Sequence, residues 1–247
     1  MPDDAIPGRI PEVQQFRTTH WSVVLRASRS ENADEAHRAL EELCRAYWYP
    51  IYAFIRRRGT GLHDAQDLTQ AFFEKLLEKQ TLAVADRQRG RFRTFLLSAL
   101  NNFLINEARD AKRLKRGGGA EVISLDLETA EQQLALEPVS GESPERVYER
   151  NWVEVMMRRV LDRLQADSVT EGQAERFSQL RVYLVGEQGA PSFTEMANRL
   201  GLTEAAVKGL VRRLRARYRL LFREEIAQTL GDDQDIDAEI KYLMTLY

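Results

Sequence analysis

Residues 192–217 read SFTEMANRLGLTEAAVKGLVRRLRAR, and this stretch decides much of the fold. Ser192 and Glu195 have the spacing of a capping box, in which two residues satisfy each other's backbone N–H groups at the start of a helix. Gly201 can adopt the left-handed conformation of a tight turn. Thr203 is a good N-cap for the next helix. The spacing therefore predicts a helix-turn-helix, with one short helix before the glycine turn and a longer one after Thr203.

The second helix of this motif is strongly basic. Lys208, Arg212, Arg213 and Arg215 lie on or beside the face that the corner leaves exposed. Lysine and arginine neutralise phosphates, and arginine can read guanine edges in the major groove. A helix corner without a DNA role is the alternative, and the basic side chains argue against it. Gly209 weakens this helix by about 1 kcal/mol relative to alanine, and it either permits a close backbone approach or is simply tolerated.

Charge is sorted into blocks along the 247 residues, although the whole chain has a net charge of only −2. Residues 87–116 have nine basic and two acidic side chains, and residues 204–223 have seven and one. The acidic blocks are 120–151, with eight acidic and two basic side chains, and 224–247, with seven and one. Two separate basic clusters suggest two surfaces for a polyanion, although solvated helix faces are the simpler explanation.

Helical periodicity dominates the chain, and the one ambiguous strand-like run is Val122–Leu127. We expect helices over Trp21–Ala27, Glu35–Arg58 with a kink or division at Pro50, Asp64–Lys79, Phe92–Lys115, a segment opening at Ser143-Pro144, and Ala174–Val185. The fold class is therefore all-α. The Gly117–Gly119 run and the acidic stretch behind it predict a boundary between two helical domains. The expected divisions are an N-terminal extension (1–34), a first domain (35–116), a flexible acidic linker (117–142), a second domain (143–230) and an acidic tail with a short helix (231–247).

Composition excludes several classes of function. No apolar run reaches the length of a membrane span and no signal pattern opens the chain, so we expect a cytoplasmic protein without a membrane partner. Cys44 cannot form an internal disulfide, and its helical spacing with apolar neighbours predicts a buried thiol. The histidines, His20, His37 and His63, are scattered singly. We therefore expect neither a metal nor any other cofactor.

The helix expected over Phe92–Lys115 carries two stripes. One is apolar and predicts a core-facing surface. The other contains Asn102, Asn106, Arg109 and Arg113 and becomes more basic toward its end. Asparagine offers a paired donor and acceptor to base edges, and arginine adds charge, so this stripe is a second candidate nucleic-acid surface. A solvated face is the alternative.

Three motifs in the chain resemble those of a known protein family. They are Asp64–Phe72 (DAQDLTQAF), Arg91–Leu96 (RFRTFL) and Ala206–Arg215 (AVKGLVRRLR). In this order, with a linker between them, they resemble the extracytoplasmic-function (ECF) branch of bacterial RNA polymerase sigma factors, over about Leu40–Arg116 and Ser143–Leu230. The first resembles the family's polymerase-binding helix, the second the start of its −10-element helix, and the third its −35-element recognition helix.

The resemblance implies a promoter-specificity subunit that helps to melt DNA and is not an enzyme. Its implied partners are promoter DNA and core RNA polymerase, through the β′ clamp region and the β subunit, and it leaves room for an anti-sigma factor. The implied polymerase-binding residues are Asp64, Asp67, Gln70 and Glu74. The implied −10-element residues are Arg91, Arg93, Asn102, Asn106, Arg109 and Arg113. The implied −35-element residues are Thr203, Lys208, Arg212, Arg213 and Arg215.

Two other functions fit parts of the sequence. A helix-turn-helix regulator that binds a duplex operator would need neither a second DNA-binding helix nor a polymerase-docking face. A nuclease could use Asp64, Asp67 and Glu74 as metal ligands, but no histidine or second acidic cluster accompanies them. The acidic tail with its amphipathic piece Ile236–Tyr247 departs from the family pattern; a solvated packing appendage is the favoured interpretation, and an autoregulatory helix is the alternative.

Overall fold

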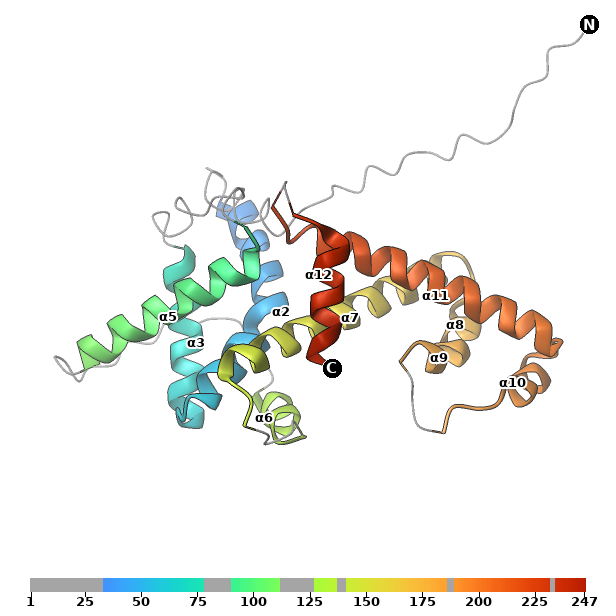
Figure 1. Cartoon of the computed structure of the whole chain (residues 1–247), viewed down its shortest axis with the longest axis horizontal. Coiled ribbons are helices and arrows are strands. Elements are labelled where there is room, and N and C mark those ends of the chain that lie inside the picture. Colours follow the sequence, from blue (N-terminus) through green and yellow to red (C-terminus); the bar gives the residue numbers. More distant parts are fainter. Residues whose placement is uncertain (1–32, 78–89, 112–126, 137–140, 186–188, 232–233) are drawn as a thin grey trace, which may run out of the picture.

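The computed structural model describes residues 33–77, 90–111, 127–136, 141–185, 189–231 and 234–247, and side chains of the first helix from residue 44 onward. No strand occurs within these ranges, which confirms the all-α prediction. The helices are α2 (Ala33–Arg57), α3 (Leu62–Leu77), α5 (Phe92–Ala111), α6 (Leu127–Leu136), α7 (Pro144–Thr170), α8 (Ala174–Leu180), α9 (Val182–Val185), α10 (Phe193–Leu200), α11 (Glu204–Ala227) and α12 (Ile236–Leu243), followed by the 3-10 turn η2 (Met244–Leu246) (Figure 1). The expected helix Trp21–Ala27, most of the run Val122–Leu127, and Arg113 lie outside the described residues.

Helices α2, α3 and α5 form the first part of the fold. Helix α2 continues past Pro50, so of the two expectations, a kink or a division, the division is wrong. It buries Tyr47, Ile51 and Phe54, and Cys44 is buried beside them, as the helical spacing predicted. The apolar stripe of α5 faces this core through Phe92, Leu96, Leu100 and Phe103, which confirms its predicted orientation.

Helix α7 runs through the middle of the molecule (Figure 1). Ser143 caps it by accepting a hydrogen bond from the backbone N–H of Arg146, and Pro144 follows as the first helical residue. The fully buried Trp152 on α7 stacks on Tyr47 of α2, with ring centroids 6.5 Å apart. One apolar core therefore includes side chains of α2, α5, α7, the end of α11 and α12.

Two short helices, α8 and α9, replace one expected helix. The helix expected over Ala174–Val185 is divided, because Arg181 lies in a turn between α8 and α9. Beyond it, a second and smaller apolar cluster joins Leu180 of α8 to α10 and the first half of α11. Helix α11 thus spans both clusters, with Val207 and Val211 in the small one and Phe222 in the large one. None of the described helices combines the length and apolar character needed to cross a bilayer.

Candidate nucleic-acid interfaces

The corner between α10 and α11 has the geometry that the sequence predicted. Ser192 donates its backbone N–H to the Glu195 carboxylate, 2.7 Å away, and its hydroxyl accepts the Glu195 N–H at 3.2 Å, so the capping box is confirmed. These bonds to Ser192 lower the pKa of Glu195. Gly201 adopts the left-handed conformation (φ 63°, ψ 35°), and Thr203 accepts the N–H of Ala206 to begin α11. The turn therefore depends on local signals that lie within a dozen residues.

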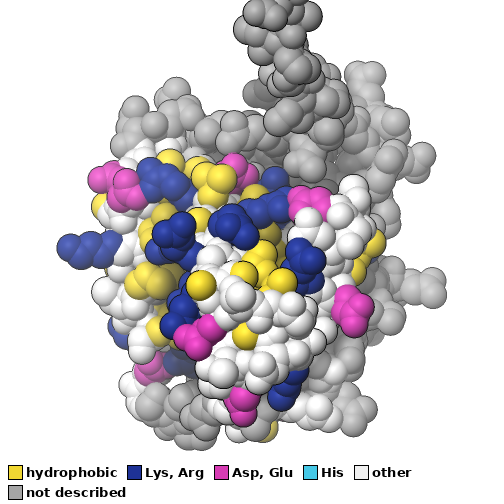
Figure 2. Space-filling model, turned by 90° about the vertical axis from the view of Figure 1, so that its right-hand side faces the viewer, with side chains coloured by type: hydrophobic (Ala, Val, Ile, Leu, Met, Phe, Trp, Pro, Cys, Tyr) yellow, Lys and Arg dark blue, Asp and Glu magenta, His cyan; other side chains and the backbone are white. Residues whose placement is uncertain are grey.

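The small cluster holds the two helices at this corner. Met196 and Ala197 of α10 pack against Val207 and Val211 of α11, and Leu180 closes the cluster from α8. The outward face of α11 is consequently left to its polar residues. Figure 2 shows this end of the molecule, where Lys and Arg side chains are spread among hydrophobic ones.

The basic side chains of α11 have different surroundings. Arg212 and Arg213 are exposed, and no hydrogen bond or ion pair among the described residues engages either of them. Lys208 is exposed but pairs with Glu204 one turn earlier. Arg215 donates two hydrogen bonds to the backbone carbonyl of Tyr183, at 3.2 and 3.0 Å. Arg212 and Arg213, in the first half of α11, thus present their charge to solvent, whereas Arg215 holds the neighbouring helix α9.

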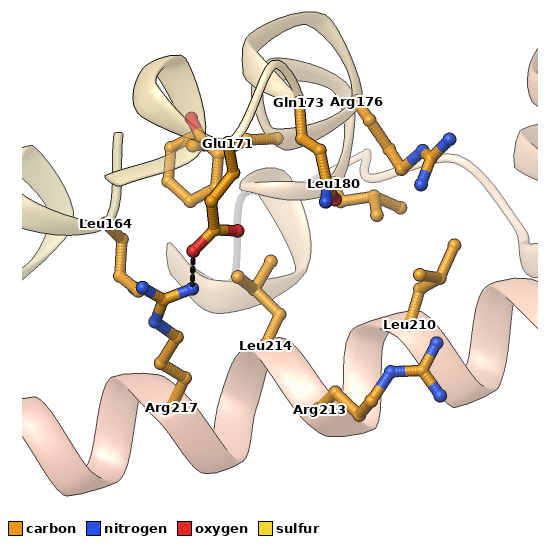
Figure 3. A pocket seen from close by; sticks show the side chains of 11 residues that line it. Leu164, Glu171, Gln173, Arg176, Leu180, Leu210, Arg213, Leu214 and Arg217 are labelled. Carbon is orange, nitrogen blue, oxygen red and sulfur yellow. Dashed lines mark hydrogen bonds and ion pairs between the residues drawn. The ribbon is translucent and has the colours of Figure 1, made fainter. Parts of the chain in front are cut away.

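A pocket with a volume of about 320 Å³ lies beside this helix (Figure 3). Its lining includes the apolar residues Leu164, Phe177, Leu180, Leu210 and Leu214. Arg176 of α8 and Arg213 of α11 lie on opposite sides of it. An ion pair of 2.8 Å between Arg217 and Glu171 joins α11 to the end of α7 at the same place. The pocket can receive an apolar side chain and place an anion against the two arginines.

The second candidate surface lies on α5. Asn102, Asn106 and Arg109 are exposed on one side of the helix, as the stripe in the sequence implied. A pocket with a volume of about 400 Å³ opens next to them between α3 and α5. Its lining includes Phe72, Leu76, Phe95, Phe103, Asn102 and Asn106. Phe72 and Phe103 are buried in the core, so the half-buried Phe95 is the aromatic ring that can offer a stacking surface beside the exposed amides.

Helix α3 has one buried face and one exposed, acidic face. Ala65, Phe72 and Leu76 are buried against the core. Asp64, Asp67 and Glu74 are exposed on the other side, and the half-buried Gln70 donates a weak hydrogen bond of 3.4 Å to Glu74. Within the described ranges no group of three or more His, Cys, Asp or Glu side chains has the geometry of a metal site.

The first part of the chain matches a known protein family. Residues 43–114, which include α3 and α5, match the sigma-70 region 2 family. This match supports membership of the sigma-70 family. It thereby supports a sigma factor role in transcription initiation, in which core RNA polymerase and promoter DNA are the partners. No curated protein and no solved structure matches the chain.

One of the arginines expected at the region 2 DNA surface is buried, and a second, although partly exposed, is engaged in an ion pair. Arg93, expected at the DNA surface, has only 1% of its side chain exposed. It pairs with Glu239 of α12 and with Glu149 of α7, and it packs over the Trp152 ring. Arg91 is 38% exposed and pairs with the same Glu239 carboxylate at 2.7 Å. In this conformation Arg93 therefore cannot contact DNA, because the C-terminal helix covers it.

Part of the acidic segment that follows region 2 in the sequence is helical and packed, which the sequence did not predict. Residues 127–136, expected within a flexible linker, form helix α6, and Ala130 is buried against the core. Glu131 forms a bidentate ion pair with Arg56 of α2, with both N–O distances 2.9 Å, and accepts the Tyr52 hydroxyl. The bonds to Arg56 lower the pKa of Glu131 to about 2, and burial together with the Glu131 bond raises the pKa of Tyr52 to about 12. Helix α6 thus packs against region 2, with Glu131 bonded to α2 and Ala130 buried in the core.

Proposed function

We propose that this sigma-70 family protein is an ECF-type sigma factor that recognises two promoter elements and helps to open the DNA. The proposed divisions are a region 2-like domain (35–116), an acidic linker (117–142), a region 4-like helix-turn-helix domain (143–230) and the C-terminal tail. The observation that carries the proposal is the presence, in one chain, of a region 2 match and a separate helix-turn-helix with exposed arginines.

Helix α3 is the proposed docking face for the β′ clamp region of core polymerase. Its apolar side is occupied by the core, so only the side with Asp64, Asp67, Gln70 and Glu74 can meet a partner. The pocket between α7, α8 and α11 is the proposed contact for the β subunit. Its apolar lining and the flanking Arg176 and Arg213 would suit a side chain of a partner helix.

The α5 surface is the proposed reader of the melted −10 element. An unstacked base could enter the pocket lined by Phe95 and Phe103 while Asn102 and Asn106 bond its edge. Capture of such a base would favour the open form of the DNA, because the free energy of binding offsets the cost of unstacking. Arg109 and Arg113 would then hold the backbone of the strand.

Helix α11 is the proposed reader of the −35 duplex. Thr203 fixes its beginning, and the exposed Arg212 and Arg213 lie in the first turns, the part of a recognition helix that enters the major groove. Lys208 can exchange its Glu204 partner for a phosphate, since an exposed pair on one helix contributes little stability. Arg215 has the same charge but holds the Tyr183 carbonyl.

Transcription with purified core polymerase tests the proposal. The full chain is added to core enzyme and fragmented genomic DNA, and the 5′ ends of the transcripts are sequenced. We expect discrete 5′ ends that require the chain and share two upstream sequence elements. If the chain binds duplex DNA but neither joins core polymerase nor yields such transcripts, it is a duplex-binding regulator and the proposal is wrong.

A further inference from the structure

The C-terminal segment Asp235–Tyr247, here called the clasp, occupies part of the proposed −10 surface. We propose that the clasp is an autoinhibitory element that imitates a bound nucleotide and must be displaced before Arg91 and Arg93 can contact DNA. This inference rests on the proposed function, since it assumes that region 2 binds the −10 element. Figure 1 shows the position of α12, which crosses α7 near the middle of the molecule.

Glu239 takes the place of a phosphate. Its carboxylate, on a side chain only 1% exposed, binds two guanidinium groups at once. One oxygen lies 2.7 Å from Nε of Arg91, and the other accepts a hydrogen bond from Nη1 of Arg93. Paired guanidinium groups around one anion are also the arrangement with which arginine holds a phosphate, so the carboxylate and a DNA backbone would compete for the same donors.

Tyr242 takes the place of a base. Its ring lies one turn after Glu239, with the guanidinium carbons of Arg91 and Arg93 at 5.6 and 5.8 Å from the ring centroid. Its hydroxyl donates a hydrogen bond to Glu149 of α7. Arginine stacks on nucleobases in the way it stacks on aromatic side chains. The clasp therefore offers region 2 a negative group and a flat ring, which are the two features that a nucleotide presents to arginine.

Apolar contacts keep the clasp in place. Leu243 and Leu246 are buried in the main core, and Ile236 and Ile240 pack against it. The last residue, Tyr247, donates its hydroxyl to the Arg150 carbonyl of α7 at 3.3 Å. The clasp thus packs on the core, as the interpretation of a packing appendage expected, but its apolar face is buried rather than solvated. Its release would expose the apolar side chains as well as the arginines.

The closed state leaves the charged groups around Glu239 incompletely bonded. Nη2 of Arg93 is buried without a hydrogen-bond partner among the described residues, and the 2.7 Å ion pair between Nε of Arg91 and Oε2 of Glu239 lacks hydrogen-bond geometry. A buried guanidinium loses its hydration, and each unbonded N–H adds to that cost. A DNA phosphate in solvent-accessible surroundings could bond the whole group. The arrangement therefore favours exchange of Glu239 for DNA once another interaction loosens the clasp.

The face of α3 that is proposed to bind core polymerase remains accessible in the closed state. Asp64, Asp67 and Glu74 on α3 are exposed while the clasp covers Arg93. Polymerase can accordingly bind first and DNA second. The clasp would keep the free protein from binding single-stranded DNA through region 2 and would give way in the assembled enzyme.

Binding of a short fluorescent single-stranded DNA of mixed sequence to the free full-length chain tests the inference. Glu239→Gln removes the charge that holds both arginines. Asp237→Asn is the matched control, because the exposed Asp237 pairs with Arg223 and with neither Arg91 nor Arg93. We expect Glu239→Gln to bind the oligonucleotide about tenfold more tightly, which corresponds to about 1.4 kcal/mol less stability of the closed state. The control should bind as the parent chain does.

Tyr242→Ala provides a second variant, because Tyr242 is partly exposed and its loss leaves the buried ion pairs in place. It should bind the oligonucleotide several-fold more tightly, and this result decides the question if Glu239→Gln fails to fold by circular dichroism. Unchanged affinity in the folded variants overturns the inference. If the parent chain transcribes with core polymerase, only the inference has failed; if it does not join the polymerase, the proposed function has failed.

Discussion

Two glycines in the helix-turn-helix should respond to alanine with opposite signs. At Gly201 (φ +63°) an added Cβ would meet no atom within 4 Å, so the whole penalty is the left-handed backbone, about 1–2 kcal/mol for an L-residue. At the helical Gly209 the nearest atom to an added Cβ is Nη1 of Arg213, 3.8 Å away, which is an ordinary contact. Gly209→Ala should therefore stabilise α11 by about 0.5–1 kcal/mol.

Hydrogen exchange measures the stability of each helix locally. It is preferred to tryptophan fluorescence, because Trp48 and Trp152 lie in the main core and would not report on the corner. In Gly201→Ala the backbone amides of α10 should exchange about five- to thirtyfold faster. In Gly209→Ala the amides in the first half of α11 should exchange about two- to fivefold more slowly. Gly59→Ala is the matched control, since Gly59 also has a positive φ with no atom near its Cβ but follows α2.

Unchanged exchange in α10 of Gly201→Ala would contradict this prediction, because the left-handed turn would then contribute nothing to the corner. Duplex binding separates the two explanations of Gly209. If Gly209→Ala stabilises the helix and binds duplex DNA as the parent does, the glycine is simply tolerated. A large loss of affinity with a stabilised helix would show that DNA approaches the backbone at this position.

Three further predictions concern charge. Arg212→Ala and Arg213→Ala should each lower the salt slope of duplex binding by about one unit in a titration with salt, without loss of core-polymerase binding in a pull-down; an unchanged slope would remove that residue from the interface. Asp67→Ala should show the reverse pattern in the same two assays, and equal loss in both would contradict the separation of surfaces. Because bonding lowers the pKa of Glu131 from 4.5 to about 2, its pairing stabilises the fold fully above 4.5 and is lost as pH falls toward 2; acid unfolding of Glu131→Gln should lack this component, and identical acid profiles would exclude it.

The helix-turn-helix could be predicted from the sequence because its determinants are local. The capping box, the turn glycine and the N-cap each act over a few residues, and each is present in the structure as predicted. The core-facing stripe of α5 was predictable for the same reason, since a periodic apolar pattern must be buried against some surface. What such signals leave open is the identity of that surface.

The pairing of Arg93 with Glu239 could not be predicted, because the two residues are 146 positions apart. The charge blocks contained a relevant signal: a basic block and an acidic tail of nearly equal and opposite charge occur in one chain. That pattern fits a polyanionic partner and an internal partner equally well. The same ambiguity hid the contact between Glu131 and Arg56, because a charged residue in an acidic segment gives no indication of its partner.

The arginines of the two proposed DNA surfaces differ in their exposure in the free chain, and this difference has a physical reason. Arg212 and Arg213 are proposed to contact a duplex that retains its stacking, so binding there would cost little distortion of the DNA. Region 2 is proposed to bind an opened strand, for which unstacking opposes the interaction. Single-stranded nucleic acid needs no such opening and would be bound indiscriminately by an uncovered region 2. Pairing of Arg91 and Arg93 with Glu239 would suppress that competing reaction while the proposed duplex reader stays exposed, so specificity would increase even if promoter affinity decreased.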